Sequence, residues 1–145
     1  MQRGRVKRKL GVHFCAVVLA VGVVLPARPA LAEDRVIEVL ADKDSRFKMA
    51  GASKPEITLK AGEHVVLRIT ARRAKTWNRD GAIHGFTLLR AKDRTKVPGW
   101  NLALQPGTHD FPMVAPSEPG EYVVVCSVIC SEEHEGMNMK LVVVP

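Results

Sequence analysis

In EITLKAGEHVVLRIT (residues 56–70), apolar and polar side chains alternate through two runs that are separated by the turn-forming pair Ala61-Gly62. Such alternation is typical of half-buried β-strands. Further strand-like segments are residues 35–40, 83–89, 109–114, 122–125 and 139–144. About seven short strands with turn signals between them, and no amphipathic helix, predict an all-β fold, a β-sandwich of Greek-key type. Residues 41–55 and 90–103 lack a clear period, so we expect short helical or irregular connections there.

Length and charge exclude several classes of protein. The chain has 145 residues, which suits one globular domain and excludes a multi-domain enzyme. Its net charge is +7, but six of its 22 basic residues lie in the first 32 positions, where there is no acidic residue. The remainder carries 16 basic and 15 acidic residues, so it has no basic surface of the kind that binds nucleic acid. The hydrophobic content of 46% is that of a packed domain.

The first 32 residues have the pattern of a secretory signal peptide. A basic start precedes an apolar run from Leu10 to Leu25, and Ala30-Leu31-Ala32 fits a signal peptidase site. We therefore expect residues 1–32 to be a cleaved signal peptide, residues 33–145 to form the mature domain, and the domain to lie in a bacterial periplasm. The alternative is an uncleaved membrane anchor, although a run of 16 residues is shorter than the roughly 20 that span a bilayer.

The chemically informative stretch is CSVICSEEHEGM (residues 126–137), between the last two predicted strands. Its possible metal donors are Cys126, Cys130, His134 and Met137. Two thiolates, an imidazole and a thioether form a soft set of ligands that suits copper far better than magnesium or calcium. A second imidazole, His84, opens an upstream strand. The sequence therefore predicts a copper site at one end of the sandwich, where a loop carries the ligands and the strands hold it.

The second cysteine distinguishes between kinds of copper site. A blue-copper site uses one thiolate, two histidines and a weak axial methionine. A single copper ion would leave the second sulfur without a role, whereas two bridging thiolates can hold two copper ions, each with one histidine. The alternative is a structural disulfide between Cys126 and Cys130, which an oxidising compartment permits. A disulfide would explain neither of the histidines nor Met137.

From His84 to Val144, and more loosely from Val36, the chain resembles the dinuclear copper A domain of cytochrome c oxidase subunit II and of nitrous-oxide reductase, which is a cupredoxin. The similarity lies in His-Gly-Phe at residues 84–86, in the segment from Pro106-Gly107 to Pro119-Gly-Glu-Tyr122, and in the C-x3-C-x3-H-x2-M loop. It implies a cupredoxin-like Greek-key sandwich and a centre of two copper ions.

The resemblance also implies a role for each ligand. His84 and His134 would be terminal ligands, Cys126 and Cys130 bridging thiolates, and Met137 a weak ligand, with the main-chain carbonyl of Val128 as the other weak donor. Three residues depart from the family pattern: Val128 stands where oxidase subunits commonly have Glu, and Ser131 replaces a frequent Gly. The Asp that often lies three residues before the first His is here Asp80, four residues before His84. The oxidase subunit's paired membrane helices and aromatic electron-entry cluster are absent.

We expect an electron-transfer protein rather than an enzyme, with oxidase activity only within a larger complex. Its partner would be a redox protein such as a cytochrome or a respiratory oxidase, with no nucleic acid, and with a membrane only if the N-terminal segment is uncleaved. The acidic residues Glu132, Glu133 and Glu135 either form a rim that attracts a basic partner or are simply solvated. Two alternatives remain: a periplasmic copper chaperone or storage protein, and a disulfide-stapled structural module.

Overall fold

The computed structural model describes residues 34–75 and 80–145. These residues form two β-sheets. The first has the strand order β2-β1-β4-β7 and the second β3-β9-β8-β5-β6. The strands are β1 Arg35–Ala41, β2 Phe47–Lys48, β3 Glu56–Lys60, β4 His64–Ala71, β5 His84–Arg90, β6 Lys96–Leu104, β7 Gly107–Val114, β8 Gly120–Val125 and β9 Asn138–Val144, and a single 3₁₀ turn, η1 His134–Gly136, precedes β9.

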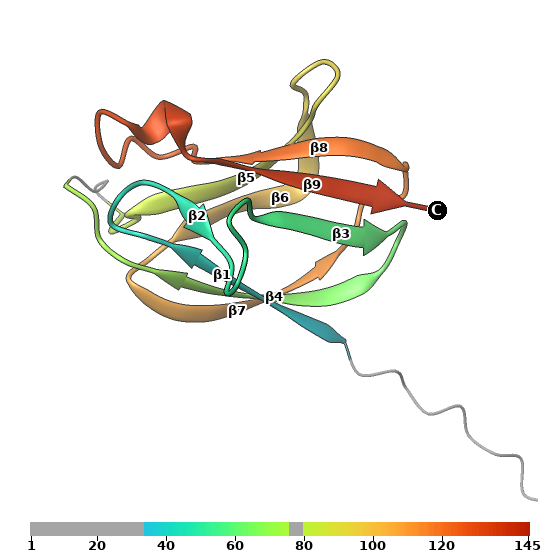
Figure 1. Cartoon of the computed structure of the whole chain (residues 1–145), viewed down its shortest axis with the longest axis horizontal. Coiled ribbons are helices and arrows are strands. Elements are labelled where there is room, and N and C mark those ends of the chain that lie inside the picture. The colour runs from blue at the N-terminus through green and yellow to red at the C-terminus, as the bar shows by residue number, and fades with distance from the viewer. Residues whose placement is uncertain (1–33, 76–79) are drawn as a thin grey trace, which may run out of the picture. The chain divides into compact units, whose positions relative to one another are not determined.

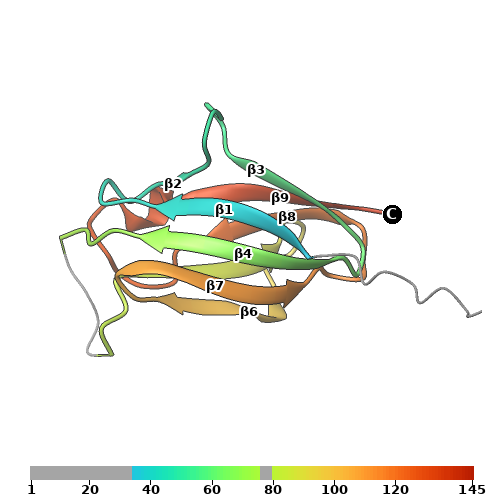
Figure 2. The ribbon, with the colours of Figure 1, turned by 90° about the horizontal axis from the view of Figure 1, so that it is seen from below.

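The two sheets pack face to face as the layers of a sandwich (Figures 1 and 2). Strand β1 runs parallel to β4 and β3 runs parallel to β9, while the other pairs are antiparallel. The chain passes from one sheet to the other five times: between β2 and β3, β3 and β4, β4 and β5, β6 and β7, and β7 and β8. The predicted all-β sandwich is therefore confirmed.

Alternating side chains account for the core between the sheets. Along β4, Val65, Leu67 and Ile69 are at most 1% exposed, while the intervening residues are more open to solvent. Strand β3 alternates in the same way through Ile57 and Leu59. Each apolar side chain of this size contributes roughly 1.5–3 kcal/mol when it is fully buried, so the alternating runs both specify the strands and stabilise the sandwich.

Two strands lie where the sequence predicted helical or irregular connections. Strand β2 lies within residues 41–55. Strand β6 lies within residues 90–103 except for its last residue, Leu104. Both strands are at sheet edges. The alternation in β6 is interrupted at Pro98-Gly99, and the pairing of β6 with β5 shifts register between Thr87 and Leu89. An edge strand with an irregular register buries no regular face, which is why periodicity did not reveal it.

The predicted signal peptide, residues 1–32, lies outside the described residues. In the part of the chain that the structure describes, no helix has both the length and the apolar character needed to cross a membrane.

Strand directions bring distant parts of the sequence to one end of the sandwich. Strand β5 begins at His84 and is antiparallel to β8, which ends at Val125, so the start of one lies beside the end of the other. Strands β1 and β4 end together, with Ala41 opposite Ala71. The turn after β1 and the loop after β8 therefore both extend beyond the same end, as Figure 1 shows.

Candidate metal centre

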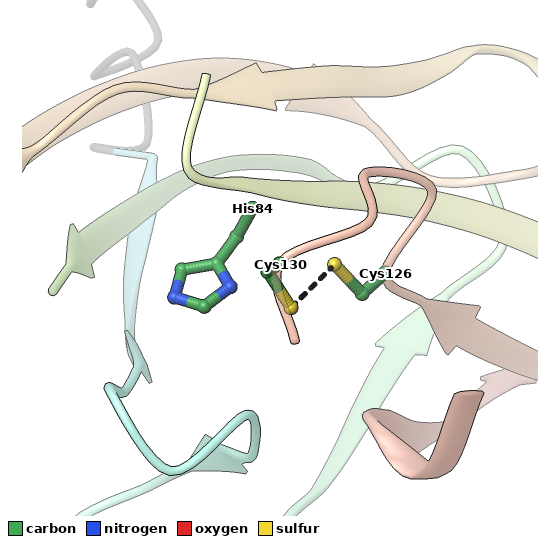
Figure 3. A group of neighbouring side chains, drawn as sticks. All are labelled: His84, Cys126 and Cys130. Atoms are coloured by element: carbon green, nitrogen blue, oxygen red, sulfur yellow. Dashed lines mark hydrogen bonds between the residues drawn. The ribbon is translucent and has the colours of Figure 1, made fainter. Parts of the chain in front are cut away.

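Three possible metal ligands converge at this end of the sandwich. One ligand atom from each of His84, Cys126 and Cys130 lies within 4.8 Å of the other two, and all three residues are buried (Figure 3). The two sulfur atoms are 3.7 Å apart and are not joined as a disulfide. The predicted convergence of residue 84 with the two cysteines is thus present in the fold, while their role as ligands stays a prediction.

The imidazole of His84 has one nitrogen engaged and one without a partner. Its Nε2 lies 2.8 Å from the main-chain oxygen of Arg72, and because a carbonyl only accepts, Nε2 carries the proton. Nδ1 is buried and has no hydrogen-bond partner. Burial lowers the pKa of His84, against the opposing effect of the Arg72 carbonyl, so the ring is held neutral. A neutral imidazole with a fixed tautomer and an unpaired, buried nitrogen is what a metal ligand requires.

The thiol of Cys126 lies between main-chain groups. The backbone N–H of Gly85 donates to its sulfur over 3.3 Å, and the sulfur lies 3.1 Å from the carbonyl oxygen of Val128. Burial raises the pKa of Cys126 to about 11, so the thiol is protonated at neutral pH when no metal is bound. The carbonyl that the resemblance assigns as a weak donor therefore lies against one of the two sulfurs.

The sulfur of Cys130 contacts the turn that joins two strands of the other sheet. It lies 3.7 Å from the hydroxyl oxygen of Ser45, in the turn between β1 and β2. The same hydroxyl is hydrogen-bonded to that of Ser131 at 2.7 Å. Ser45 and Ser131 are 3% and 7% exposed, so both hydroxyls are withdrawn from water and depend on these partners.

The remaining predicted ligands border this group. His134 is half-buried in η1 and outside the three-residue cluster, and its Nδ1 lies 3.2 Å from the carbonyl oxygen of Ser131. A metal bound at Nδ1 would have to replace that hydrogen bond. Met137 is fully buried, and its carbonyl accepts from the backbone N–H of Cys126 over 3.1 Å, which ties the end of the loop to its beginning.

Other residues singled out by their type lie away from the cluster. His64 and His109 are exposed, as expected for surface histidines. Met139 is 2% exposed in the core. Trp100 and Tyr122 are buried, and each donates a hydrogen bond to a main-chain oxygen, so both pack as structural aromatic residues.

Sequence reasoning missed three groups that support the cluster: the hydroxyl of Ser45, the N–H of Gly85 and the carbonyl of Arg72. The last two are main-chain groups, which leave no signal in the sequence. Ser45 lies 85 residues from Cys130 in a segment without periodicity. The only available signal was Ser131, which stands where the resembled family frequently has Gly and which proves to be Ser45's partner.

Two free thiols and an unpaired imidazole nitrogen in a buried site fit copper by their chemistry. Thiolate and imidazole are soft to borderline donors, and no carboxylate belongs to the cluster that the described residues form. The groups around the sulfurs come from strand β5, from the turn between β1 and β2 and from the cysteine loop itself. The protein is therefore able to hold its donors in place before a metal arrives.

No family model and no curated protein sequence matches this chain. Among solved structures, it is similar to auracyanin A, a "blue" copper protein from the green thermophilic photosynthetic bacterium Chloroflexus aurantiacus. The TM-score is 0.52 at 20% identity, over 75% of this chain and 98% of that one. The chain has the cupredoxin fold. The copper protein rusticyanin matches this cupredoxin sandwich with a TM-score of 0.52 at 17% identity, over 76% of this chain and 78% of the other.

Two oxidases are also among the similar solved structures. A multi-copper oxidase from Pediococcus acidilactici has a TM-score of 0.50 at 15% identity, and 83% of this chain covers 28% of that one. A heme-copper terminal oxidase dimer has a TM-score of 0.47 at 21% identity, over 86% of this chain and 76% of the other, and supports no conclusion. Identities this low establish the fold alone.

The state of the donors predicts how binding depends on pH. The Cys126 thiol, with its pKa of about 11, must lose a proton to bind a metal, whereas His84 is already neutral. Copper affinity of the reduced protein should therefore rise about tenfold per pH unit for each thiol proton displaced, from about pH 6 to about pH 8. Isothermal titration calorimetry in buffers of different ionisation enthalpy measures the protons released. An affinity that does not change with pH would contradict thiolate ligation.

Proposed function

We propose that this cupredoxin domain binds a dinuclear copper A-type centre and transfers single electrons. The observation that carries the proposal is the unpaired, buried Nδ1 of His84 beside two free thiols whose sulfurs are 3.7 Å apart. A structural disulfide would leave that imidazole unexplained. A blue-copper site would leave the second buried thiol unexplained, because such a site uses one cysteine.

In this proposal two copper ions would be held by Cys126 and Cys130 as the bridging thiolates and by His84, through Nδ1, and His134 as terminal ligands. Met137 and the carbonyl of Val128 would be weak donors. When bound, the copper pair supplies one-electron redox chemistry, with the unpaired electron spread over two metals and two sulfurs. The chain's own groups hold the ligands and exclude water: Arg72 fixes the His84 tautomer, and Gly85 donates to the Cys126 sulfur.

The fold suits a role in electron transfer because it restricts movement at the site. The donors lie at the start of β5 and on the loop after β8, and the Cys126 backbone is tied to Met137 at the end of that loop. A set of ligands that cannot move far keeps its geometry when the charge of the centre changes by one electron. This argues for a redox role over copper storage or delivery, in which a metal must be released readily.

The surface beside the centre supports a protein partner. Ile129, between the two cysteines, is 67% exposed, and Glu132, Glu133 and Glu135 next to it are exposed carboxylates. An exposed apolar side chain beside negative charge suits a partner with a basic rim, whose approach the charges would accelerate. We place such a redox partner, a cytochrome or a respiratory oxidase, at this face and the domain in the periplasm.

Copper titration with voltammetry tests the proposal. The reduced chain lacking residues 1–32 should take up two copper ions per molecule and then undergo a reversible one-electron reduction. One copper ion per molecule with reversible redox behaviour would instead indicate a mononuclear site. Copper uptake followed by transfer to an apo-acceptor, without reversible reduction, would favour a chaperone or storage protein, and no uptake under anaerobic reducing conditions would favour a structural module.

The weak-ligand role of Met137 gives a separate prediction. Met137→Leu should keep both copper ions and shift the reduction potential upward, because leucine removes a weak sulfur donor and leaves an apolar side chain of similar size. Met139→Leu is the matched control, since Met139 is a buried methionine of the core and should leave the potential unchanged. Voltammetry of the loaded variants measures both. Loss of copper from Met137→Leu would contradict a weak role.

A further inference from the structure

The turn between β1 and β2 holds Ser45 in an unusual backbone conformation. Its φ angle is 56°, in the left-handed region that glycine adopts most readily. The turn is closed by hydrogen bonds from Ser45 N to the oxygen of Asp42 and from Asp42 N to the oxygen of Arg46, both 3.0 Å long. Glycine would satisfy this turn with less strain, so a serine here is best explained by a role of its side chain.

The Ser45 side chain reaches the candidate metal centre. Its hydroxyl lies 3.7 Å from the Cys130 sulfur and 2.7 Å from the Ser131 hydroxyl, and the residue is 3% exposed. Ser45 lies in the turn that joins β1 and β2 of the first sheet, whereas the cysteine loop follows β8 of the other sheet. This hydroxyl therefore connects the opposite layer of the sandwich to the loop.

The direction of these hydrogen bonds follows from the groups that can only donate or only accept. The backbone N–H of Glu133 donates to the Ser131 oxygen over 3.1 Å, which leaves the Ser131 proton for Ser45. Without a metal, the Cys130 thiol donates to the Ser45 oxygen. A Cys130 sulfur that has lost its proton to a bound metal only accepts, so it then receives the Ser45 proton. Each group then donates to the next: the Glu133 N–H to the Ser131 oxygen, the Ser131 hydroxyl to the Ser45 oxygen, and the Ser45 hydroxyl to the Cys130 sulfur.

We propose that Ser45 is a positioning residue for the metal centre: its hydroxyl, aligned by Ser131, donates to the Cys130 thiolate and raises the reduction potential of copper bound there. The effect on the reduction potential rests on the proposed function, because it requires copper at this site. A hydrogen bond to a ligating sulfur withdraws electron density from the metal–sulfur bond and so favours the reduced state. Cys126 receives its hydrogen bond from Gly85 N–H, so each thiolate has one donor, from opposite sheets.

Voltammetry of copper-loaded variants tests the role of the hydroxyl. Ser45→Ala and Ser45→Gly should both lower the reduction potential, and Ser45→Gly should fold readily because glycine suits the turn. Arg94→Gly is the matched control, because Arg94 also has a positive φ, of 63°, but lies in the turn between β5 and β6. The reduction potential of copper in this variant should equal that in the wild type. Unchanged potentials in both Ser45 variants would overturn the inference.

A double variant tests whether Ser131 acts through Ser45. Ser131→Gly should lower the potential less than Ser45→Ala does, because the Ser45 hydroxyl remains. The double variant Ser45→Ala with Ser131→Gly should have the same potential as Ser45→Ala alone. Shifts that simply add would contradict the proposed chain of donation.

A metal-free measurement separates this inference from the proposed function. In the reduced protein without copper, Arg94→Gly should raise the midpoint of thermal unfolding by relieving backbone strain. Ser45→Gly gains the same relief but loses the buried hydroxyl, so its midpoint should be clearly lower than that of Arg94→Gly. Equal midpoints would overturn the structural role of Ser45, whereas a wild-type chain that binds no copper would overturn the proposed function.

Discussion

Replacing Cys130 by serine is expected to abolish the dinuclear copper signal completely. The two sulfurs lie 3.7 Å apart, and the proposal assigns both as bridges, so that neither copper ion keeps its geometry when one sulfur is lost. Cys126→Ser should have the same effect. Electron paramagnetic resonance of the copper-loaded variants should show a mononuclear signal or no specific copper, and a dinuclear signal retained in Cys130→Ser would contradict bridging.

The control for these variants removes exposed histidines instead of sulfurs. His64 and His109 are surface residues that could bind copper adventitiously. The double variant His64→Ser with His109→Ser should therefore keep the wild-type signal and two tightly bound copper ions. A loss of copper in this variant comparable to that in Cys130→Ser would mean that the signal does not come from the buried cluster.

Gly85→Ala is expected to cause the largest loss of stability from a single added methyl group. A Cβ atom at residue 85 would lie 2.7 Å from the backbone nitrogen of Ser127 and 3.2 Å from its Cα atom, in addition to contact with its hydroxyl. The Ser127 backbone would have to move, and with it the adjoining Cys126. We expect the free energy of unfolding to fall by roughly 1–3 kcal/mol, as for other overpacked sites, and copper affinity to fall as well.

Chemical denaturation of the metal-free protein measures this change. Gly136→Ala, in the cysteine loop, is the matched control, because a Cβ atom there would meet nothing within 4 Å. Its unfolding free energy should stay within about 0.5 kcal/mol of the wild-type value. Equal stability of the two variants would mean that the close approach of β5 to the cysteine loop does not constrain the site.

Much of the fold could be predicted because strands such as β3 and β4 bury one regular face. The alternation in residues 56–70 reports directly which side chains enter the core, and the structure buries them. The edge strand β6 could not be predicted in this way, because Pro98-Gly99 interrupts its pattern and its side chains are mostly exposed. Periodicity reveals a strand only where burial imposes it.

The metal centre, too, could be predicted only in part from the sequence. Cys126 and Cys130 could be grouped with His84 because thiols and imidazoles have few roles in common besides metal binding. The groups that orient them could not be found, because they are a carbonyl at Arg72, an N–H at Gly85 and a hydroxyl at Ser45. A carbonyl belongs to every residue and an N–H to every residue but proline, so neither group marks a position in the sequence. The Ser45 hydroxyl depends on a contact across the sandwich.

Electron paramagnetic resonance of the wild-type domain, loaded with copper and purified, tests the central claim most directly. If one unpaired electron is shared equally by two copper nuclei, the hyperfine pattern has seven lines, and this is the result we expect. A four-line pattern from a single copper nucleus, in a protein whose two cysteines are both reduced and intact, would contradict the dinuclear centre.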